Sequence, residues 1–154
     1  MNAVEISVEG IGTPPWLERA RDFTLAVLAR LGKDGWDLSI LICDDSFIRG
    51  LNRQYRDRDE ATDVLSFEQG DVYRDPAGAE RYLAGDIVIS LDALARNAEE
   101  FGISRDEELR RLLAHGVLHL SGMDHEDDEG SRPMLLLQEE LLRELDAKGG
   151  KGIL

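Results

Sequence analysis

The sequence predicts a single α+β domain, in which one small mixed sheet of about four strands is covered by about five helices. Short apolar runs typical of strands are confined to the first 90 residues, whereas the remainder shows only helical periodicity. Because the late helices follow one another without intervening strands, the order favours α+β over a regular α/β alternation. A chain of 154 residues suits one domain, 1–154, with a core large enough to need no disulfide.

The first half of the chain is predicted to alternate between strand and helix. Residues 4–8 alternate apolar and polar side chains, as a half-buried strand does. Thr13 before Pro14 is typical of a helix start, and Asp44 or Asp45 is a suitable cap for a second helix. The predicted elements are a strand at 4–8, a helix from Thr13 to Leu31, a strand at 36–43 and a helix ending near Tyr55.

The second half is predicted to become helical after two more strands. Residues 70–84 are polar and contain proline and glycine, so we expect an exposed loop that overhangs the functional site. Ser104 and Glu107 form a capping box that opens an apolar helix. The predicted elements are strands at 64–67 and 86–90, a helix at 91–101, the capped helix to Leu120, a last helix begun by Ser131 and Pro133, and a frayed tail at 147–154.

All three histidines of the chain lie between residues 115 and 125. His115 and His119 are four residues apart, so on a helix their imidazoles share one face. Gly122 can then end the helix in a left-handed conformation, which lets His125 turn back toward the pair. Three histidines with a fourth position left to water are typical of a catalytic zinc site, whereas structural zinc sites are closed by four protein ligands. The alternative is a pair of ordinary core or surface histidines.

The histidine spacing also matches that of one class of zinc proteases, with a difference. Those enzymes carry a glutamate directly after the first histidine as the general base. Here that position is Gly116, so the usual proton acceptor for peptide hydrolysis is missing. A metallopeptidase-like hydrolase therefore remains only as an alternative.

The stretch from His115 to His125, H-G-V-L-H-L-S-G-M-D-H, resembles the signature of the YbeY family of bacterial metal-dependent endoribonucleases. Two further blocks agree with that family, L-N-R-Q-Y-R at 51–56 with T-D-V-L-S-F at 62–67, and G-D-I-V-I-S at 85–90. One departure is Glu68, which stands where such proteins commonly have proline. The resemblance spans about residues 36 to 125.

The resemblance implies a single-strand-preferring endoribonuclease that acts in ribosomal RNA maturation and ribosome quality control. One Zn²⁺ per chain, or another divalent metal, would be held by His115, His119 and His125. The metal would supply a hydroxide near neutral pH, either to attack phosphorus or to activate the RNA 2′-hydroxyl. Arg56 and His115 are the expected catalytic residues, with Arg56 placing its planar guanidinium against a phosphate.

The net charge of −14 disfavours bulk attraction to RNA, because an acidic protein is repelled by a polyanion. Four arginines nevertheless cluster between residues 49 and 58, and we expect Arg49, Arg53 and Arg56 to contact RNA. For Arg49, Arg53 and Arg58, a solvated, salt-bridged helix face is the alternative, whereas Arg56 is supported by the family resemblance. The expected partners are ribosomal RNA precursors and the ribosomal particle or its proteins. Asp86 and Asp124 are candidate hydrogen-bond acceptors that orient ligand imidazoles, and the alternative for each is a helix or turn cap.

The composition predicts a cytoplasmic protein without membrane segments. The lone cysteine, Cys43, cannot form an internal disulfide and ends an apolar run, so we interpret it as a buried small hydrophobe. Neither a signal peptide nor a run of membrane-spanning length is evident. A non-catalytic, ribosome-associated zinc protein remains open, since a fourth ligand would close the metal site.

Overall fold

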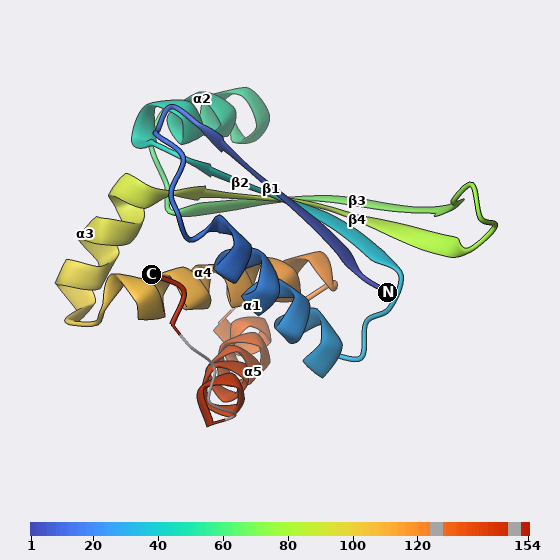
Figure 1. Cartoon of the computed structure of the whole chain (residues 1–154). Helices are drawn as coiled ribbons and strands as arrows, with labels where there is room; N and C mark the ends of the chain where they lie inside the picture. Colours follow the sequence, from blue (N-terminus) through green and yellow to red (C-terminus); the bar gives the residue numbers. More distant parts are fainter. Residues whose placement is uncertain (124–127, 148–151) are drawn as a thin grey trace.

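The structure, a computed structural model, describes residues 1–123, 128–147 and 152–154, and it confirms the predicted fold class (Figure 1). Four strands form one sheet in the order β1-β2-β4-β3. The pairs β1–β2 and β2–β4 are parallel and β3–β4 is antiparallel, so the sheet is mixed. The elements are β1 (Ala3–Glu9), α1 (Leu17–Arg30), β2 (Trp36–Cys43), α2 (Asp45–Arg56), β3 (Val64–Arg74), β4 (Glu80–Ser90), α3 (Leu91–Phe101), α4 (Arg105–Leu120) and α5 (Asp128–Ala147).

The two faces of the sheet bury different helices, because side chains alternate along each strand. On one face, residues such as Ile40 and Ile87 form the main core with α1, α4 and α5. On the other face, Val88 and Leu65 pack with Ile48 of α2 in a smaller cluster. Figure 1 shows α2 alone on its side of the sheet, with α1, α4 and α5 on the opposite side. The arrangement fixes which functional residues share a face.

Residues 70–84, predicted as a loop, instead form most of a long hairpin (Figure 1). Only the turn at 75–79 is irregular, and Asp75 closes it by accepting hydrogen bonds from Gly78 and Ala79. The hairpin side chains are largely exposed, so no apolar alternation marks the strands, yet cross-strand hydrogen bonds satisfy the backbone. Because the hairpin projects away from the helices, it does not overhang α4.

A bulge lies where the sequence departs from the family pattern. The register of β3 against β4 shifts between Glu68 and Asp71. Opposite this point Gly85 has φ of +141°, and a Cβ there would lie 2.0 Å from the carbonyl oxygen of Phe67. Strand pairing therefore continues past Glu68 only because residue 85 has no side chain.

Two predicted helix starts are wrong. Helix α1 begins at Leu17, and Trp16 at its N-cap makes no side-chain capping hydrogen bond, so Thr13 and the prolines precede the helix. Packing of its apolar stripe, including the fully buried Ala20 and Val27, positions α1 instead. Helix α5 begins at Asp128 and not at Ser131, so Pro133 lies inside the helix. The described helices include none that is long and apolar enough to cross a membrane.

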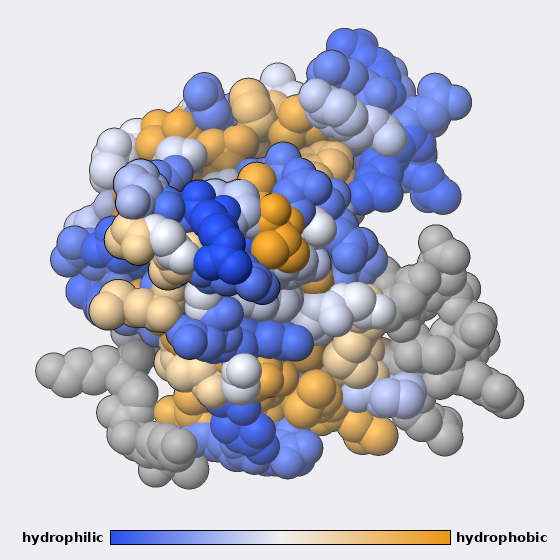
Figure 2. Space-filling view, turned by 90° about the vertical axis from the view of Figure 1, so that its right-hand side faces the viewer, coloured by the Kyte–Doolittle hydropathy of each residue, from blue (hydrophilic) through white to orange (hydrophobic). Residues whose placement is uncertain are grey.

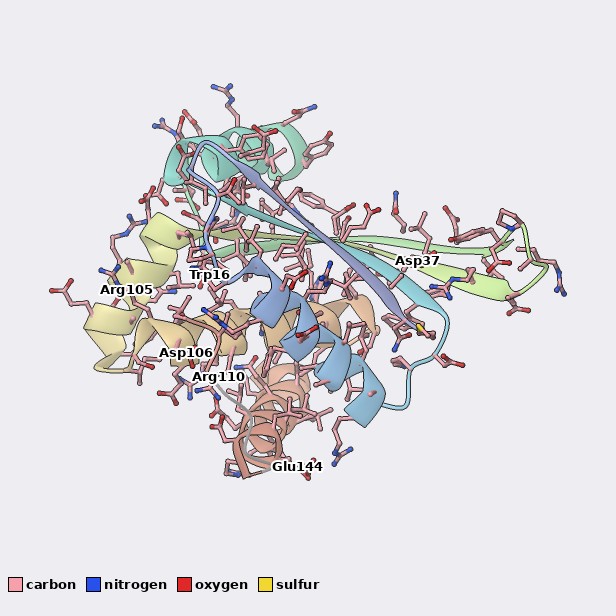
Figure 3. All side chains as sticks on the ribbon, in the orientation of Figure 1. Trp16, Asp37, Arg105, Asp106, Arg110 and Glu144 are labelled. Carbon is pink, nitrogen blue, oxygen red and sulfur yellow. The ribbon has the colours of Figure 1, made fainter. Side chains whose placement is uncertain are left out.

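The end of the chain is docked, which corrects the predicted fraying for residues 152–154. Ile153 is 1% exposed and belongs to the main core. Its carbonyl accepts a hydrogen bond from Arg19 Nε at 2.5 Å, and the amide of Leu154 donates to Asp106 Oδ1 at 2.9 Å. Figure 3 shows Asp106 beside Arg110 on α4, where the two side chains are hydrogen bonded. Residues 148–151 lie outside the described part of the chain.

Candidate functional site

Helix α4 carries His115 and His119 through the centre of the molecule. Ser104 caps its start by accepting a hydrogen bond from the Glu107 amide at 3.0 Å, as predicted. Most residues between Leu112 and Leu120 are buried, whereas His115 and His119 are partly exposed. The unbroken helix places both imidazoles on one face at the border between core and solvent.

Gly116 brings α4 unusually close to the sheet. A Cβ at this position would lie 2.8 to 2.9 Å from three side-chain atoms of Ile87, a fully buried residue of β4. Position 116 therefore faces the core. The glutamate that zinc proteases carry after their first histidine has no space here, so the structure gives a packing reason for the glycine.

His115 is held from α5 by the side chain of Gln138. The Nδ1 atom of His115 lies 3.0 Å from Gln138 Oε1, and Gln138 is only 6% exposed. The next residue, Glu139, accepts two hydrogen bonds from Arg111 of α4, both 2.8 Å long. The hydrogen bonds from Arg111 are the largest influence on the pKa of Glu139, and they lower it. Burial acts in the opposite direction, but the charge of Arg111 and the contact with Gln138 also lower the pKa, so the net shift is downward. Glu139 is therefore an anion fixed between α4 and α5.

A cavity of about 290 Å³ adjoins His115 and is lined by both apolar and acidic residues. Asn97 donates hydrogen bonds to Asp63 Oδ2 at 2.9 Å and to Glu108 Oε2 at 3.0 Å. Glu108 is 3% exposed, and burial raises its pKa. The lining residues are Asp63, Val64, Phe101, Glu108, Arg111, Leu112, His115 and Gln138.

The chain turns after α4 as predicted. Gly122 has φ of +98°, and the amides of Gly122 and Met123 donate to the carbonyls of His119 and Leu118. His125 and Asp124 lie outside the described residues, so their roles as metal ligand and orienting acceptor stay predictions. Among the residues that the structure describes, no group of three metal-binding side chains is found.

The described part of the site fits a divalent metal. Gln138 Oε1 lies 3.0 Å from His115 Nδ1, and when Nδ1 carries the proton that this oxygen accepts, the acceptor lone pair of the ring is on Nε2. An imidazole with its second nitrogen hydrogen bonded in this way is the usual form of a metal ligand. His119 lies one helical turn further along the same face.

Arg56 ends α2 and reaches the edge strand of the sheet. Its Nη2 donates to the carbonyl of Ser66 at 2.8 Å, and its guanidinium carbon lies 5.4 Å from the ring centre of Phe67. Ser66 is two residues along β3 from Val64, which lines the cavity beside His115. The start of β3 therefore links Arg56 to the neighbourhood of His115, although the two residues belong to helices on opposite faces of the sheet.

The other predicted RNA-binding arginines differ in their surroundings. Arg49 makes two hydrogen bonds to Asp59, at 2.9 and 3.2 Å, and this pairing lowers the pKa of the Asp59 carboxyl. Arg53 is exposed on the same helix. In Figure 2 the upper part of the molecule, at the height of α2, shows a hydrophilic area with a hydrophobic area beside it. Arg49 thus matches the alternative of a salt-bridged helix face, and Arg53 and Arg56 present positive charge.

Asp86 does not lie where an orienting role needs it. Its carboxylate accepts a hydrogen bond from Ser39 Oγ, and with Val88 it lines a groove of about 490 Å³ beneath α2. The neighbouring Ile87 points to the other face, against Gly116 of α4. Since the sheet separates Asp86 from His115 and His119, the prediction that it orients their imidazoles is not supported.

Cys43 is fully buried in the cluster beneath α2, as predicted. Burial, reinforced by nearby carboxylates, raises the pKa of its thiol to about 12. The thiolate required of a nucleophile is therefore scarce near neutral pH.

Sequence reasoning missed Gln138 and the group of Asp63, Asn97 and Glu108. A signal for Gln138 was present, since it lies four residues after Met134 and three before Leu141 on the apolar stripe of α5. A polar residue inside a buried stripe requires a partner. No comparable pattern marked Asn97, because its partners, Asp63 just before β3 and Glu108 of α4, meet only in the folded chain.

Comparison with known proteins defines the class of this α+β chain. The family model described as "Endoribonuclease YbeY" matches residues 11–146. A protein of that name from Treponema denticola is 59% identical over 124 residues, covering 80% of each chain. Another from Treponema pallidum is 49% identical over 142 residues, covering 92% of this chain and 89% of the relative.

A solved structure agrees with the sequence relatives. The solution structure of TM1509 from Thermotoga maritima aligns with a TM-score of 0.66 and 29% identity, over 94% of this chain and 90% of that one. The chain belongs to the Endoribonuclease YbeY family.

Proposed function

We propose that the chain is a metal-dependent endoribonuclease that cleaves single-stranded RNA during ribosomal RNA maturation. The observation that carries the proposal is the pair of partly exposed histidines on α4, with the Nδ1 of His115 already engaged by Gln138. The name shared by its relatives, Endoribonuclease YbeY, supports RNA cleavage as the reaction.

His115 and His119, with His125 as the predicted third ligand, would hold one Zn²⁺ or a similar divalent ion. Such an ion lowers the pKa of bound water and stabilises charge that develops on a phosphate. His115 and His119 would bind the ion through imidazole nitrogens, and the apolar residues around them in α4 are buried. A catalytic glutamate next to His115 has no room, which disfavours a metallopeptidase.

Arg56 is proposed to bind the phosphate at the scissile position. Its guanidinium uses one nitrogen for the Ser66 carbonyl and lies near the Phe67 ring, so the side chain is held in place. A planar group with several donors can bind two phosphate oxygens at once. Arg53 on the same helix would contact a neighbouring phosphate, and nearby Tyr55 is 60% exposed and offers a ring for base stacking.

The acidic charge of the chain favours delivery of RNA by a binding partner over direct binding of free RNA. With a net charge of −14, long-range attraction to free RNA is unfavourable, and we propose that the ribosomal particle or its proteins bring the substrate to the site. We also propose a role in ribosome quality control in the cytoplasm.

The test is cleavage of a single-stranded RNA by purified protein of known zinc content. We expect about one zinc per chain, with both zinc binding and cleavage lost in His115→Ala. In Arg56→Glu we expect cleavage to fall at least about 100-fold with zinc retained, as for loss of a transition-state charge contact. Arg21→Glu, on the exposed side of α1, reverses the same charge away from the site and should cleave normally.

Cleavage that survives both His115→Ala and Arg56→Glu would refute the assignment. Zinc binding without cleavage of any ribosomal RNA fragment would favour the non-catalytic zinc protein instead. Hydrolysis of peptides by the zinc-loaded chain would point to the metallopeptidase.

A further inference from the structure

We propose that Gln138 is a positioning residue that fixes His115 in the tautomer with its proton on Nδ1, so that Nε2 faces the metal as an acceptor. The inference rests on the proposed metal site, and it adds a residue of α5 to that site. The contact that carries it is the 3.0 Å approach of His115 Nδ1 to Gln138 Oε1.

The side chain of Gln138 presents its amide oxygen to His115. The carboxylate of Glu139 accepts two hydrogen bonds from Arg111, so Glu139 is held as an anion. Gln138 also helps to lower the pKa of Glu139, which agrees with an amide nitrogen on the side of that carboxylate. The amide oxygen of Gln138 is the atom that lies 3.0 Å from His115 Nδ1, and an oxygen accepts only from a protonated Nδ1.

Burial makes this hydrogen bond decisive for the tautomer. Gln138 is 6% exposed, so water competes poorly for its amide oxygen. If the His115 proton moved to Nε2, two acceptors would face each other at 3.0 Å, and a buried acceptor without a donor costs about 1–3 kcal/mol. The hydrogen bond therefore disfavours the tautomer that cannot bind a metal through Nε2.

The arrangement couples the site to the packing of two helices. Arg111 and His115 are four residues apart on α4, and Gln138 and Glu139 are adjacent on α5, so two paired contacts align the helices at this level. Such acceptors behind a metal-binding histidine commonly change metal affinity or activity 10–100-fold when they are removed, about the size of effect we expect here.

The experiment uses Gln138→Leu, which keeps the size of the side chain and removes the acceptor, and Gln138→Glu, which keeps an acceptor for Nδ1–H. Histidine nitrogen chemical shifts of the metal-free full chain report the tautomer of each ring, and competition with a chelator reports zinc affinity. We expect wild type and Gln138→Glu to hold His115 with the proton on Nδ1. In Gln138→Leu we expect a shift toward the Nε2-protonated tautomer and about 10–100-fold weaker zinc binding.

Several controls separate this inference from a general loss of structure. His119, observed in the same spectra, should keep its tautomer in all variants, and Leu136→Ala, at an exposed position of α5, should change neither readout. An unchanged His115 tautomer and zinc affinity in Gln138→Leu would overturn the inference. If wild type itself bound no zinc, the proposed function would fail, while the tautomer spectra would still decide whether Gln138 sets the state of His115.

Discussion

Gly116 shows how a single residue can reflect both packing and chemistry. From the sequence, its importance was the missing general base next to His115. In the fold, the position faces Ile87 so closely that any side chain would displace α4 from β4. The histidines therefore depend on this glycine for their depth in the molecule.

We predict that Gly116→Ala destabilises the chain. Overpacking against Ile87 costs about 1–3 kcal/mol, and the better helix propensity of alanine offsets up to about 1 kcal/mol of it. Urea unfolding should therefore show a net loss near 1 kcal/mol. Gly50→Ala in α2, where a Cβ meets nothing within 4 Å, is the matched control and should raise stability. Equal effects at both positions would contradict the packing argument.

Glu108 is a second residue that lowers the stability of the fold only because folding buries its carboxylate. Its carboxyl is buried beside Asp63, and burial raises its pKa. Below the ordinary pKa of a glutamate, both folded and unfolded chains hold the proton, so the group has no effect on stability. As pH rises above that value, the unfolded chain releases the proton first, and stability falls until the folded pKa is passed.

Glu108→Gln should therefore be more stable than wild type at pH 7, because an uncharged amide avoids the burial cost and its oxygen can still accept from Asn97. The difference should vanish near pH 4. Thermal unfolding of both proteins across pH 4 to 8 measures the two curves. A constant gap over this range would indicate a packing effect of the substitution and would contradict the role of the charge.

At the scale of elements, α2 is the helix whose ends matter most for function, since it ends at Arg56. Asp44 caps its start by accepting from the Phe47 amide at 2.9 Å. Its other end is Asp57, whose φ of 56° lies in the left-handed region. One end is thus stabilised by a side chain, and the other carries a conformation that glycine adopts more readily.

We predict opposite effects at the two ends of α2. Asp44→Ala should lower the free energy of unfolding by about 1 kcal/mol, through loss of the cap. Asp57→Gly should leave stability unchanged or raise it, because glycine accepts a positive φ without a Cβ penalty. Chemical denaturation of both variants tests the pair, and a stable Asp44→Ala protein would show that packing alone holds the helix start.

At the scale of the whole molecule, the charge of −14 contrasts with the polyanion that the proposed function requires. The positive groups near the site are few, and Arg49 is already paired with Asp59. Binding of single-stranded RNA should therefore release few counterions from the RNA, even if the proposed cleavage site binds RNA tightly.

We predict a shallow salt dependence of RNA binding. Three arginine–phosphate contacts at most correspond to a slope of about −2 in a plot of log affinity against log salt concentration. Arg53→Ala should reduce the slope by about 0.7, as expected for one single-strand contact. Fluorescence anisotropy with a short RNA gives both values, with Arg21→Ala as the control. A much steeper slope would contradict the limit of three arginine–phosphate contacts and would indicate a more extended basic surface.

The sequence by itself determined the fold class, most element bounds and the histidine pair, because helical and strand periodicity and the i, i+4 spacing are local properties. The caps at Asp44 and Ser104 were readable for the same reason. Tertiary structure alone decided the hairpin at 70–84, whose exposed strands lack an apolar pattern, and the docking of Ile153. It also decided that Asp86 faces away from α4 and that Gln138 meets His115, since such contacts join distant segments and depend on sheet face and helix packing.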